Sequence, residues 1–190
     1  DYIAGRLPEY RVEFRQKTAS GGWKWISSVG KIVERDADGK PLRMLGTHTD
    51  IDARKATEER LRTLSRVVEQ SPESIVITNL AAEIQYVNEA FTRATGYTRE
   101  EMLGRNPRIL QSGKTPASTY AAMWDALHQG QVWEGEFHNR RKDGREYVEW
   151  AIIIPVRQLD GRITHYAAIR NDITERKRLG AELDRHRYHL

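Results

Sequence analysis

The chain has 190 residues, of which 31 are Lys or Arg and 27 are Asp or Glu, giving a formal net charge of +4. This length predicts one large domain or two small ones. The absence of cysteine excludes disulfides, zinc–thiolate sites, cysteine nucleophiles and cysteinyl-flavin photochemistry. The chain starts with Asp1 and has no signal-peptide pattern. We therefore expect an excised piece of a cytoplasmic protein.

The charges are interspersed along the chain, with the densest basic clusters at 140–142 and 176–178. Nucleic-acid binding needs a basic face with interleaved aromatic residues, and neither cluster has one. The longest apolar run, residues 150–156, is far shorter than the roughly 20 residues that span a membrane. We therefore expect no nucleic-acid partner and no membrane contact within this chain.

An internal repeat at an offset of 122 residues organises the chain. The matching segments are Trp25-Ile26 with Tyr147-Val148, Asp38-Gly39 with Asp160-Gly161, and Asp50-Ile51-Asp52 with Asp172-Ile173-Thr174. Phe14 matches Phe137 if the first turn of the upstream copy has one extra residue. Each copy predicts an antiparallel three-stranded meander, because β-rich runs alternate with Asp-Gly or Gly-containing turns. In the second copy the strands are expected at 131–140, 146–156 and 162–173.

A polar helical segment follows each meander. The first, residues 52–70, carries Leu61, Leu64 and Val68 at spacings of three and four. After the second, the same rhythm continues through Leu179, Leu183, His186 and Leu190. A narrow apolar stripe on a charged helix is typical of a coiled-coil seam, so dimerisation through these helices is expected. Gly180 weakens the second helix.

Residues 73–130 have no upstream counterpart and predict two strands followed by short helices. The strands are expected at 75–78 and 84–87, and the helices at 89–95, after 98, and at 117–128. Asn88 is a candidate helix cap, and Thr98 to Glu101 is a capping-box pattern. Together with the second meander, this order predicts an α+β domain of roughly 110 residues.

This order, with these residues, resembles the PAS sensor fold. The motifs that carry the resemblance are residues 87–91 with 95–97, residues 102–107, residues 133–136 with 139–144, and the Asp172-Ile173-Thr174 exit signal. It implies a five-stranded antiparallel sheet with short helices, flanked by coiled-coil signalling helices. The expected organisation is the last three strands of a first PAS domain at 1–52, a helical linker at 53–70, a complete second PAS domain at 71–174, and the start of a signalling helix at 175–190.

The resemblance also implies a function. PAS domains are sensory, dimerising modules, so we expect a homodimer that relays a small-molecule or redox signal to an effector in the same full-length chain. The exit helix resembles those that lead into histidine kinases, and diguanylate cyclases use similar connectors. The expected relay residues are Asp50, Asp172 and Thr174. A module that binds no ligand and only sets dimer geometry is the alternative, and no enzyme activity is expected within this chain.

Two flavin-binding PAS subgroups resemble parts of the sequence. The LOV subgroup matches at Asn106, Arg108 and Gln111, which the resemblance implies would contact the flavin and its phosphate. The sequence departs from that subgroup at three positions: Pro107 replaces the photoactive cysteine, and Glu149 and Arg170 replace an Asn and a Gln. The redox-sensing, FAD-binding subgroup matches around Trp133 and Asn139. The candidate cofactor-binding residues are therefore Asn106, Arg108, Gln111, Trp133, Asn139 and Glu149.

Simpler interpretations stand beside these. FAD, another small molecule, no cofactor and haem all remain open. Asn106 is also expected as a cap before Pro107, and Trp133 as a core residue. A charged Glu149 facing inward would need a partner, for which Arg170 and Arg108 are candidates. The six histidines lack metal-site spacing, so no metal is expected.

Overall fold

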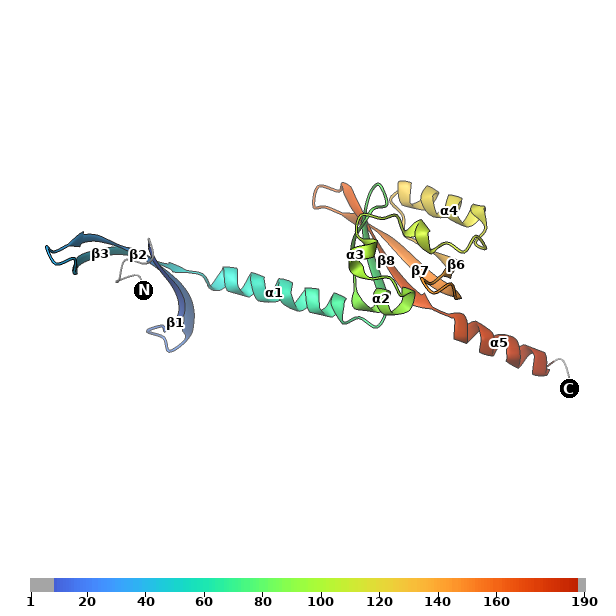
Figure 1. The fold of residues 1–190 in the computed structure, drawn as a ribbon, viewed down its shortest axis with the longest axis horizontal. Coiled ribbons are helices and arrows are strands. Elements are labelled where there is room, and N and C mark those ends of the chain that lie inside the picture. The colour runs from blue at the N-terminus through green and yellow to red at the C-terminus, as the bar shows by residue number, and fades with distance from the viewer. Residues whose placement is uncertain (1–8, 188–190) are drawn as a thin grey trace. The chain divides into compact units, whose positions relative to one another are not determined.

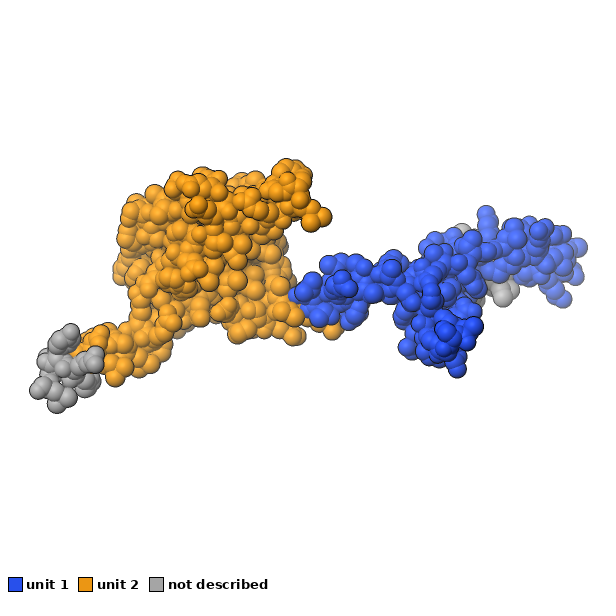
Figure 2. Space-filling view, turned by 180° about the vertical axis from the view of Figure 1, so that it is seen from behind, with its two compact units in different colours: residues 1–65 blue, residues 66–190 orange. Residues whose placement is uncertain are grey.

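The computed structural model describes residues 9–187, with side chains described up to residue 185. The chain divides into two compact units at residues 65 and 66 (Figure 2). The first unit holds a three-stranded sheet and the second a five-stranded sheet with helices. Each unit is described by itself.

Three antiparallel strands make up the first sheet, in the order β1-β2-β3 (Figure 1). They are β1 (Tyr10–Lys17), β2 (Trp23–Arg35) and β3 (Pro41–Asp50). The β2–β3 turn closes through Gly39, whose φ of 80° favours glycine. Every residue of β3 is exposed, and few residues of the sheet are buried. This sheet therefore has little core of its own.

Helix α1 (Asp52–Glu69) follows β3, and none of its residues is buried. Near its start, Arg54 and Lys55 both pair with Glu13 of β1, and the Lys55 ammonium lies 4.9 Å from the Trp25 ring centroid. The stripe residues Leu61 and Leu64 are exposed in the single chain. The helix is as the sequence predicts, whereas dimerisation through its stripe stays a prediction.

The second unit has the predicted PAS architecture. Its antiparallel sheet has the order β5-β4-β8-β7-β6. The strands are β4 (Ser74–Asn79), β5 (Ile84–Val87), β6 (Trp133–Arg140), β7 (Glu146–Arg157) and β8 (Ile163–Asp172). Between β5 and β6 lie α2 (Glu89–Thr95), α3 (Arg99–Met102), the 3₁₀ helix η1 (Pro107–Leu110) and α4 (Ala117–His128). The α+β prediction and the five-stranded sheet are confirmed.

Side-chain helix caps predicted from the sequence set the boundaries of the helices. The Asn88 side chain accepts from Phe91 N and starts α2, and Thr98 with Glu101 forms the predicted capping box of α3. Asn88 is fully buried and also bonds the backbone of Val68 and Glu73 through Nδ2. It therefore ties the last turn of α1 and the segment that follows it to the first helix of the domain.

The core lies between the inner face of the sheet and these helices. Alternate residues of each strand point inward, as the period of a half-buried strand requires. The fully buried side chains include Val76, Ile84, Val87, Phe91, Met102, Leu110 and Leu127.

The structure contains the predicted repeat, but the prediction that the first turn of the upstream copy holds the extra residue is wrong. Phe14 pairs with Ile26 as Phe137 pairs with Glu149, so β1 and β2 match β6 and β7 at an offset of 123 and the first turns have equal length. Asp50 and Asp172 keep the offset of 122. The extra residue is Val33, which the register of β2 skips as a bulge. Glu149 therefore corresponds to Ile26.

Helix α5 (Thr174–Arg187) leaves the domain directly after β8 (Figure 1). Its described stripe residues Leu179 and Leu183 are exposed. The Leu190 position and the His186 side chain, which complete the predicted stripe, lie outside the described part of the chain.

Candidate functional site

A cavity of about 310 Å³ lies between the inner face of the five-stranded sheet and the segment from η1 to α4. Strands β4, β6, β7 and β8 supply one wall, and α4 supplies the other. A volume near 300 Å³ is at the lower end of the range for small-molecule sites. Most of the lining is apolar; at one end, the polar end, Asn139 and Arg170 come together, while Asn106, Arg108 and Gln111 line the cavity from η1 and its flanks.

Aromatic rings form much of the apolar wall. Tyr120 of α4 stacks on Phe137 of β6 with centroids 5.5 Å apart and an interplanar angle of 14°. Trp124 meets Tyr166 edge-on at 5.9 Å. A cavity lined by aromatic and aliphatic side chains in this way suits an apolar or aromatic ligand.

The polar end is organised by a buried carboxylate. Glu149 Oε1 accepts a 2.9 Å hydrogen bond from Asn139 Nδ2 and a 2.8 Å bond from Arg170 Nη1. The side chains of Arg170 and Glu149 are only 8% and 4% exposed. The Arg170 guanidinium also lies 6.0 Å from the Phe137 ring centroid. The opposite charges of Glu149 and Arg170 offset each other, so the exposed Arg108 is the remaining cation among the lining residues.

Two buried polar atoms beside this cluster have no hydrogen-bond partner among the described residues: Tyr147 Oη and Arg170 Nε. Burial raises the pKa of the Glu149 carboxyl, and Arg170 opposes that shift. Burial, with the nearby Glu149 charge, also raises the pKa of Tyr147. Unused buried donors are costly unless a water or a ligand satisfies them.

Four of the six candidate cofactor residues line the cavity. Asn106, Arg108 and Gln111 reach it from η1 and its flanks, and Asn139 reaches it from β6. Arg108 and Gln111 are exposed, so they lie at the rim. Asn106 also caps η1, accepting from Arg108 N at 3.0 Å, as the simpler interpretation predicts.

The other two candidates lie behind the cavity wall. Trp133 stacks on Phe137 at 5.0 Å and does not line the cavity. Gly135 makes this position available, because a Cβ there would come within 2.4 Å of the Trp133 ring. Glu149 is also outside the lining, and acts on the cavity through Asn139 and Arg170. Trp133 thus supports the aromatic wall, and Glu149 orients the polar end.

The predicted relay residues form a second cluster where β8 becomes α5. Asp172 Oδ1 accepts from Thr174 N at 2.9 Å, and Thr174 Oγ1 accepts from Val148 N at 2.9 Å. Burial would raise the pKa of Asp172, but bonds from Thr174 and the Arg141 guanidinium outweigh burial and hold the pKa below its ordinary value.

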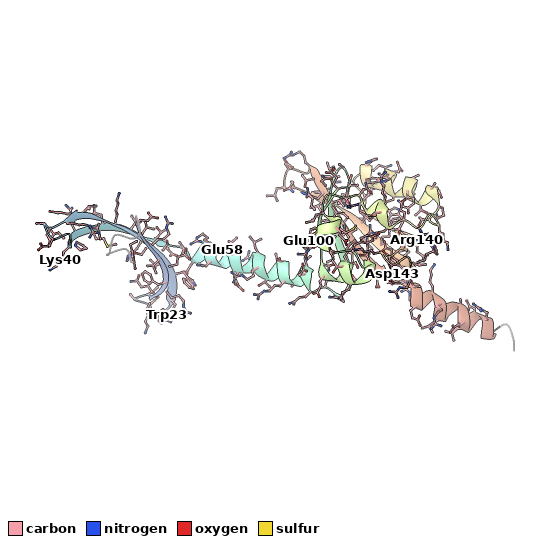
Figure 3. All side chains as sticks on the ribbon, in the orientation of Figure 1. Trp23, Lys40, Glu58, Glu100, Arg140 and Asp143 are labelled. Carbon is pink, nitrogen blue, oxygen red and sulfur yellow. The ribbon has the colours of Figure 1, made fainter. Side chains whose placement is uncertain are left out.

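Arg141 connects this cluster to the rest of the domain. It bonds Ala94 O at the end of α2 and Asp172 Oδ2, and its guanidinium lies 4.4 Å from the Tyr147 ring centroid. It lies in the turn between β6 and β7; Arg140, the last residue of β6, and Asp143, in the same turn, are labelled in Figure 3. The sequence pattern assigns no role to this basic run, so Arg141 is not among the predicted relay residues.

The first unit repeats the arrangement at the start of α1. Asp50 Oδ1 accepts from Asp52 N at 3.0 Å, and Asp52 Oδ1 accepts from Trp25 N at 2.7 Å. Asp52 therefore fills the place of Thr174. Asp50 pairs with Lys24 at 2.5 Å.

Sequence reasoning also missed the aromatic wall. In the sequence, Phe137 stands out only as the repeat match of Phe14, and no pattern points to Tyr120. The alternation of β6 could have placed Phe137 on the same face as Asn139.

Within residues 9–187 there is no cluster of metal-ligating side chains. None of the helices in that range has the length and apolar composition that a membrane crossing requires.

Comparison with known proteins places the chain by sequence and by fold. A family model described as a PAS domain matches residues 72–175, and one described as a PAS fold matches residues 1–48. The chain is 40% identical over 120 residues to a nitrogen fixation regulatory protein of Klebsiella oxytoca, covering 63% of this chain and 24% of that protein. It is 33% identical over 98 residues to the aerotaxis receptor of Escherichia coli, covering 52% of this chain and 19% of the receptor.

A solved structure supports the same placement. The LOV domain of a blue-light activated histidine kinase from Erythrobacter litoralis superposes with a TM-score of 0.52 and 28% identity, over 55% of this chain and 99% of that domain. The chain spans about a quarter of the length of the first curated relatives it matches.

Proposed function

Because the chain belongs to the PAS domain family, whose model matches residues 72–175, we propose that it is a sensory module that detects a small-molecule or redox signal and passes it to an effector domain. Relatives named as a regulatory protein and a receptor support a role in signalling. The similarity to a domain of a blue-light activated histidine kinase favours a histidine kinase as the effector.

One observation carries this proposal. Strand β8 contributes Arg170 to the cavity and, two residues later, Asp172 to the start of α5. Asp172 lies opposite Glu149 in the β7–β8 register, so the polar end of the cavity and the helix anchor share one pair of strands. A ligand that shifts Arg170 or Glu149 would therefore strain the backbone that holds α5, and bias the helix between two arrangements.

FAD is the cofactor we propose first. The aromatic and aliphatic lining offers apolar surface to an isoalloxazine, and Asn139 offers a carboxamide to its edge. Arg108 at the rim would meet a phosphate. When bound, the flavin would supply reversible redox chemistry. The chain's own residues hold and orient it, and Glu149 fixes the amide of Asn139.

The absorption spectrum of the purified chain tests the cofactor proposal, before and after addition of FAD. Flavin bands that stay with the protein through gel filtration are the expected result, and Asn139→Ala should weaken retention. Arg140→Met is the matched control, because Arg140 is an exposed neighbour on the same strand. A spectrum without flavin bands after FAD addition contradicts it, and a Soret band would indicate haem.

A relay module without a ligand is the second candidate. The exposed stripe residues Leu61, Leu64, Leu179 and Leu183 favour it, because such stripes pair in coiled coils. Both candidate functions, the ligand-binding sensor and the ligand-free relay, require a homodimer, which sedimentation velocity would detect. Both are also compatible with a diguanylate cyclase as the effector in place of a histidine kinase. Loss of dimerisation in a Leu61→Glu/Leu64→Glu variant is the expected result, and a monomeric parent chain would contradict it.

A further inference from the structure

An ion pair between the first strand of the meander and the following helix occurs at the same place in both copies of the repeat. In the upstream copy, Lys55 Nζ lies 2.6 Å from Glu13 Oε2, and in the downstream copy Lys177 pairs with Glu136. The two glutamates correspond in the register that matches β1 with β6. The two lysines are the fourth residues of α1 and α5. The contact is therefore part of the repeated architecture.

The stability of the fold does not explain why this contact recurs. The side chains of Lys177 and Glu136 are 46% and 33% exposed, and exposed ion pairs contribute little to the free energy of unfolding. The pair does impose geometry, because it joins two residues that are 41 positions apart and belong to different elements. Its main effect should therefore be on the direction of the helix.

A second contact point is what the direction of α5 requires. Asp172 accepts from Thr174 N, and Thr174 Oγ1 accepts from Val148 N, so strands β7 and β8 fix where the helix begins. A helix held at one point can still pivot about that point. Lys177 supplies another point one turn further along the helix, on strand β6, and two points define the direction of the helix axis.

Strand β6 joins this second point to the cavity. Phe137 and Asn139 line the cavity, and because successive side chains of a strand point to opposite faces, Glu136 lies on the outer face of the strand. In the order of the sheet, β6 is at the edge and has β7 as its one neighbouring strand. A displacement of β6 at the cavity would therefore reach α5 through Glu136.

We infer that Glu136 and Lys177 are positioning residues whose ion pair sets the direction in which α5 leaves the sheet, by holding the first turn of the helix to the outer face of β6. The inference deepens the proposed sensory function and rests on it for its role in signalling, because α5 is the helix that would carry the signal. It adds Lys177 to the relay residues Asp172 and Thr174.

Distances between two spin labels test this role, and the chain has no cysteine of its own to interfere. Asp125→Cys in α4 and Asp184→Cys in α5 place the labels at exposed positions, and dilution with unlabelled chain restricts the measured distances to one protomer. Lys177→Met should broaden the distance distribution. The share of helix directions outside the main one should rise by up to about fivefold, which is the change in an equilibrium that an exposed ion pair can make. An unchanged distribution would overturn the inference.

Two further variants assign the effect to the pair. Glu136→Lys/Lys177→Glu exchanges the charges and should restore the narrow distribution, whereas a distribution as broad as that of Lys177→Met would overturn the inference. Arg178→Met is the matched control, because Arg178 is an exposed cation that pairs within α5, with Glu175 and Glu182. It should leave the distribution unchanged. Equal broadening in the control would overturn the inference in favour of a general loosening of the helix.

The upstream copy provides an independent check. Glu13 also pairs with Arg54, at 2.5 Å, so it keeps a cation when Lys55 is replaced. Labels at the exposed positions 47 in β3 and 59 in α1 should therefore report less broadening for Lys55→Met than for Arg54→Met/Lys55→Met. No broadening in the double variant would overturn the inference, because it treats the two pairs as equivalent.

These outcomes are distinct from a failure of the sensory proposal, which is tested with lumiflavin, the isoalloxazine ring without the phosphate-bearing chain of FAD. If lumiflavin leaves the distances of the parent chain unchanged while Lys177→Met broadens them, the positioning role holds and the sensory proposal for flavin fails. If lumiflavin shifts the distances while Lys177→Met does not broaden them, the positioning role fails and the sensory proposal stands.

Discussion

The two copies of the three-stranded meander share a frame and differ in what they bury. Phe14 of the upstream copy corresponds to Phe137 of the downstream copy, and His48 corresponds to Arg170. The His48 ring lies 6.0 Å from the Phe14 ring, and the Arg170 guanidinium lies 6.0 Å from the Phe137 ring. Glu149, however, corresponds to Ile26. The downstream copy is covered by helices and buries an ion pair, whereas β3 of the upstream copy is exposed throughout. In the downstream copy the cavity is formed by the strands together with the helices that cover them.

The largest expected loss of stability comes from removing one partner of the buried Glu149–Arg170 ion pair. Arg170→Met leaves the Glu149 carboxylate buried without its cation, which should lower the free energy of unfolding by about 3–5 kcal/mol. His48→Met at the matched upstream position should cost no more than about 0.5 kcal/mol, because that strand is exposed. Urea denaturation followed by tryptophan fluorescence measures both.

Partial rescue would confirm the cause. Adding Glu149→Gln to Arg170→Met should recover most of the lost stability. Similar losses for the Arg170 and His48 variants would contradict the contrast between the two copies.

Substitution of Gly135 should cause the next largest loss of stability. Gly135→Ala would place a Cβ within 2.4 Å of the Trp133 ring and force it off Phe137, at a cost of about 1–3 kcal/mol. The upstream copy has Val12 at the matched position, where Val12→Ala should have a small effect. The near-ultraviolet circular dichroism of Trp133 should change only in the first variant. An unchanged signal in Gly135→Ala would show that the ring stack does not depend on the glycine.

Much of the fold could be predicted from the sequence because local chemistry fixes it. Asn88 and Thr98 cap helices wherever they precede one, and Asp-Gly pairs specify turns. The position of the Val33 bulge could not be predicted, because an insertion costs little on an exposed strand. Among the site residues, Asn106, Arg108, Gln111 and Asn139 were placed at the cavity by resemblance. That Trp133 and Glu149 lie behind the wall depends on packing across strands, which a linear pattern does not contain.

The two residues that anchor the helices, Asp172 before α5 and Asp50 before α1, should also differ in how helix stability responds to acid, but by a smaller amount. The pKa of Asp172 is held below its ordinary value, so ionised Asp172 stabilises the start of α5 at neutral pH. That contribution is lost as the pH falls below about 3.9, the pKa of an unfolded Asp, and through the lower folded value. Asp172→Asn should therefore reduce the helicity of residues 174–178 at pH 7 and much less at pH 2, as read from NMR chemical shifts.

The matched upstream variant is the control for that experiment. The pKa of Asp50 is lowered by its bond with Lys24, but both side chains are exposed, so Asp50→Asn should have the weaker effect on α1. An Asp172→Asn variant whose helicity matches the parent at pH 7 would contradict an anchoring role.

The smallest expected effect concerns the exit helix itself. Gly180 lies in α5 with open space around its Cβ position, so Gly180→Ala should stabilise the helix by up to about 1 kcal/mol. Helicity by circular dichroism should rise. Ala56→Gly in α1, which contains no glycine, should lower helicity by a similar amount. A fall in helicity in Gly180→Ala would indicate that the glycine serves a bend.

The coupling between cavity and helix can be tested directly because the chain has no cysteine of its own. Single cysteines placed along residues 175–185 give a disulfide-crosslinking profile of α5 in the proposed homodimer, measured with and without lumiflavin. The account predicts that lumiflavin moves the positions of strongest crosslinking, and that Asp172→Asn reduces this movement. Identical profiles with and without bound lumiflavin would contradict the claim that the cavity controls α5.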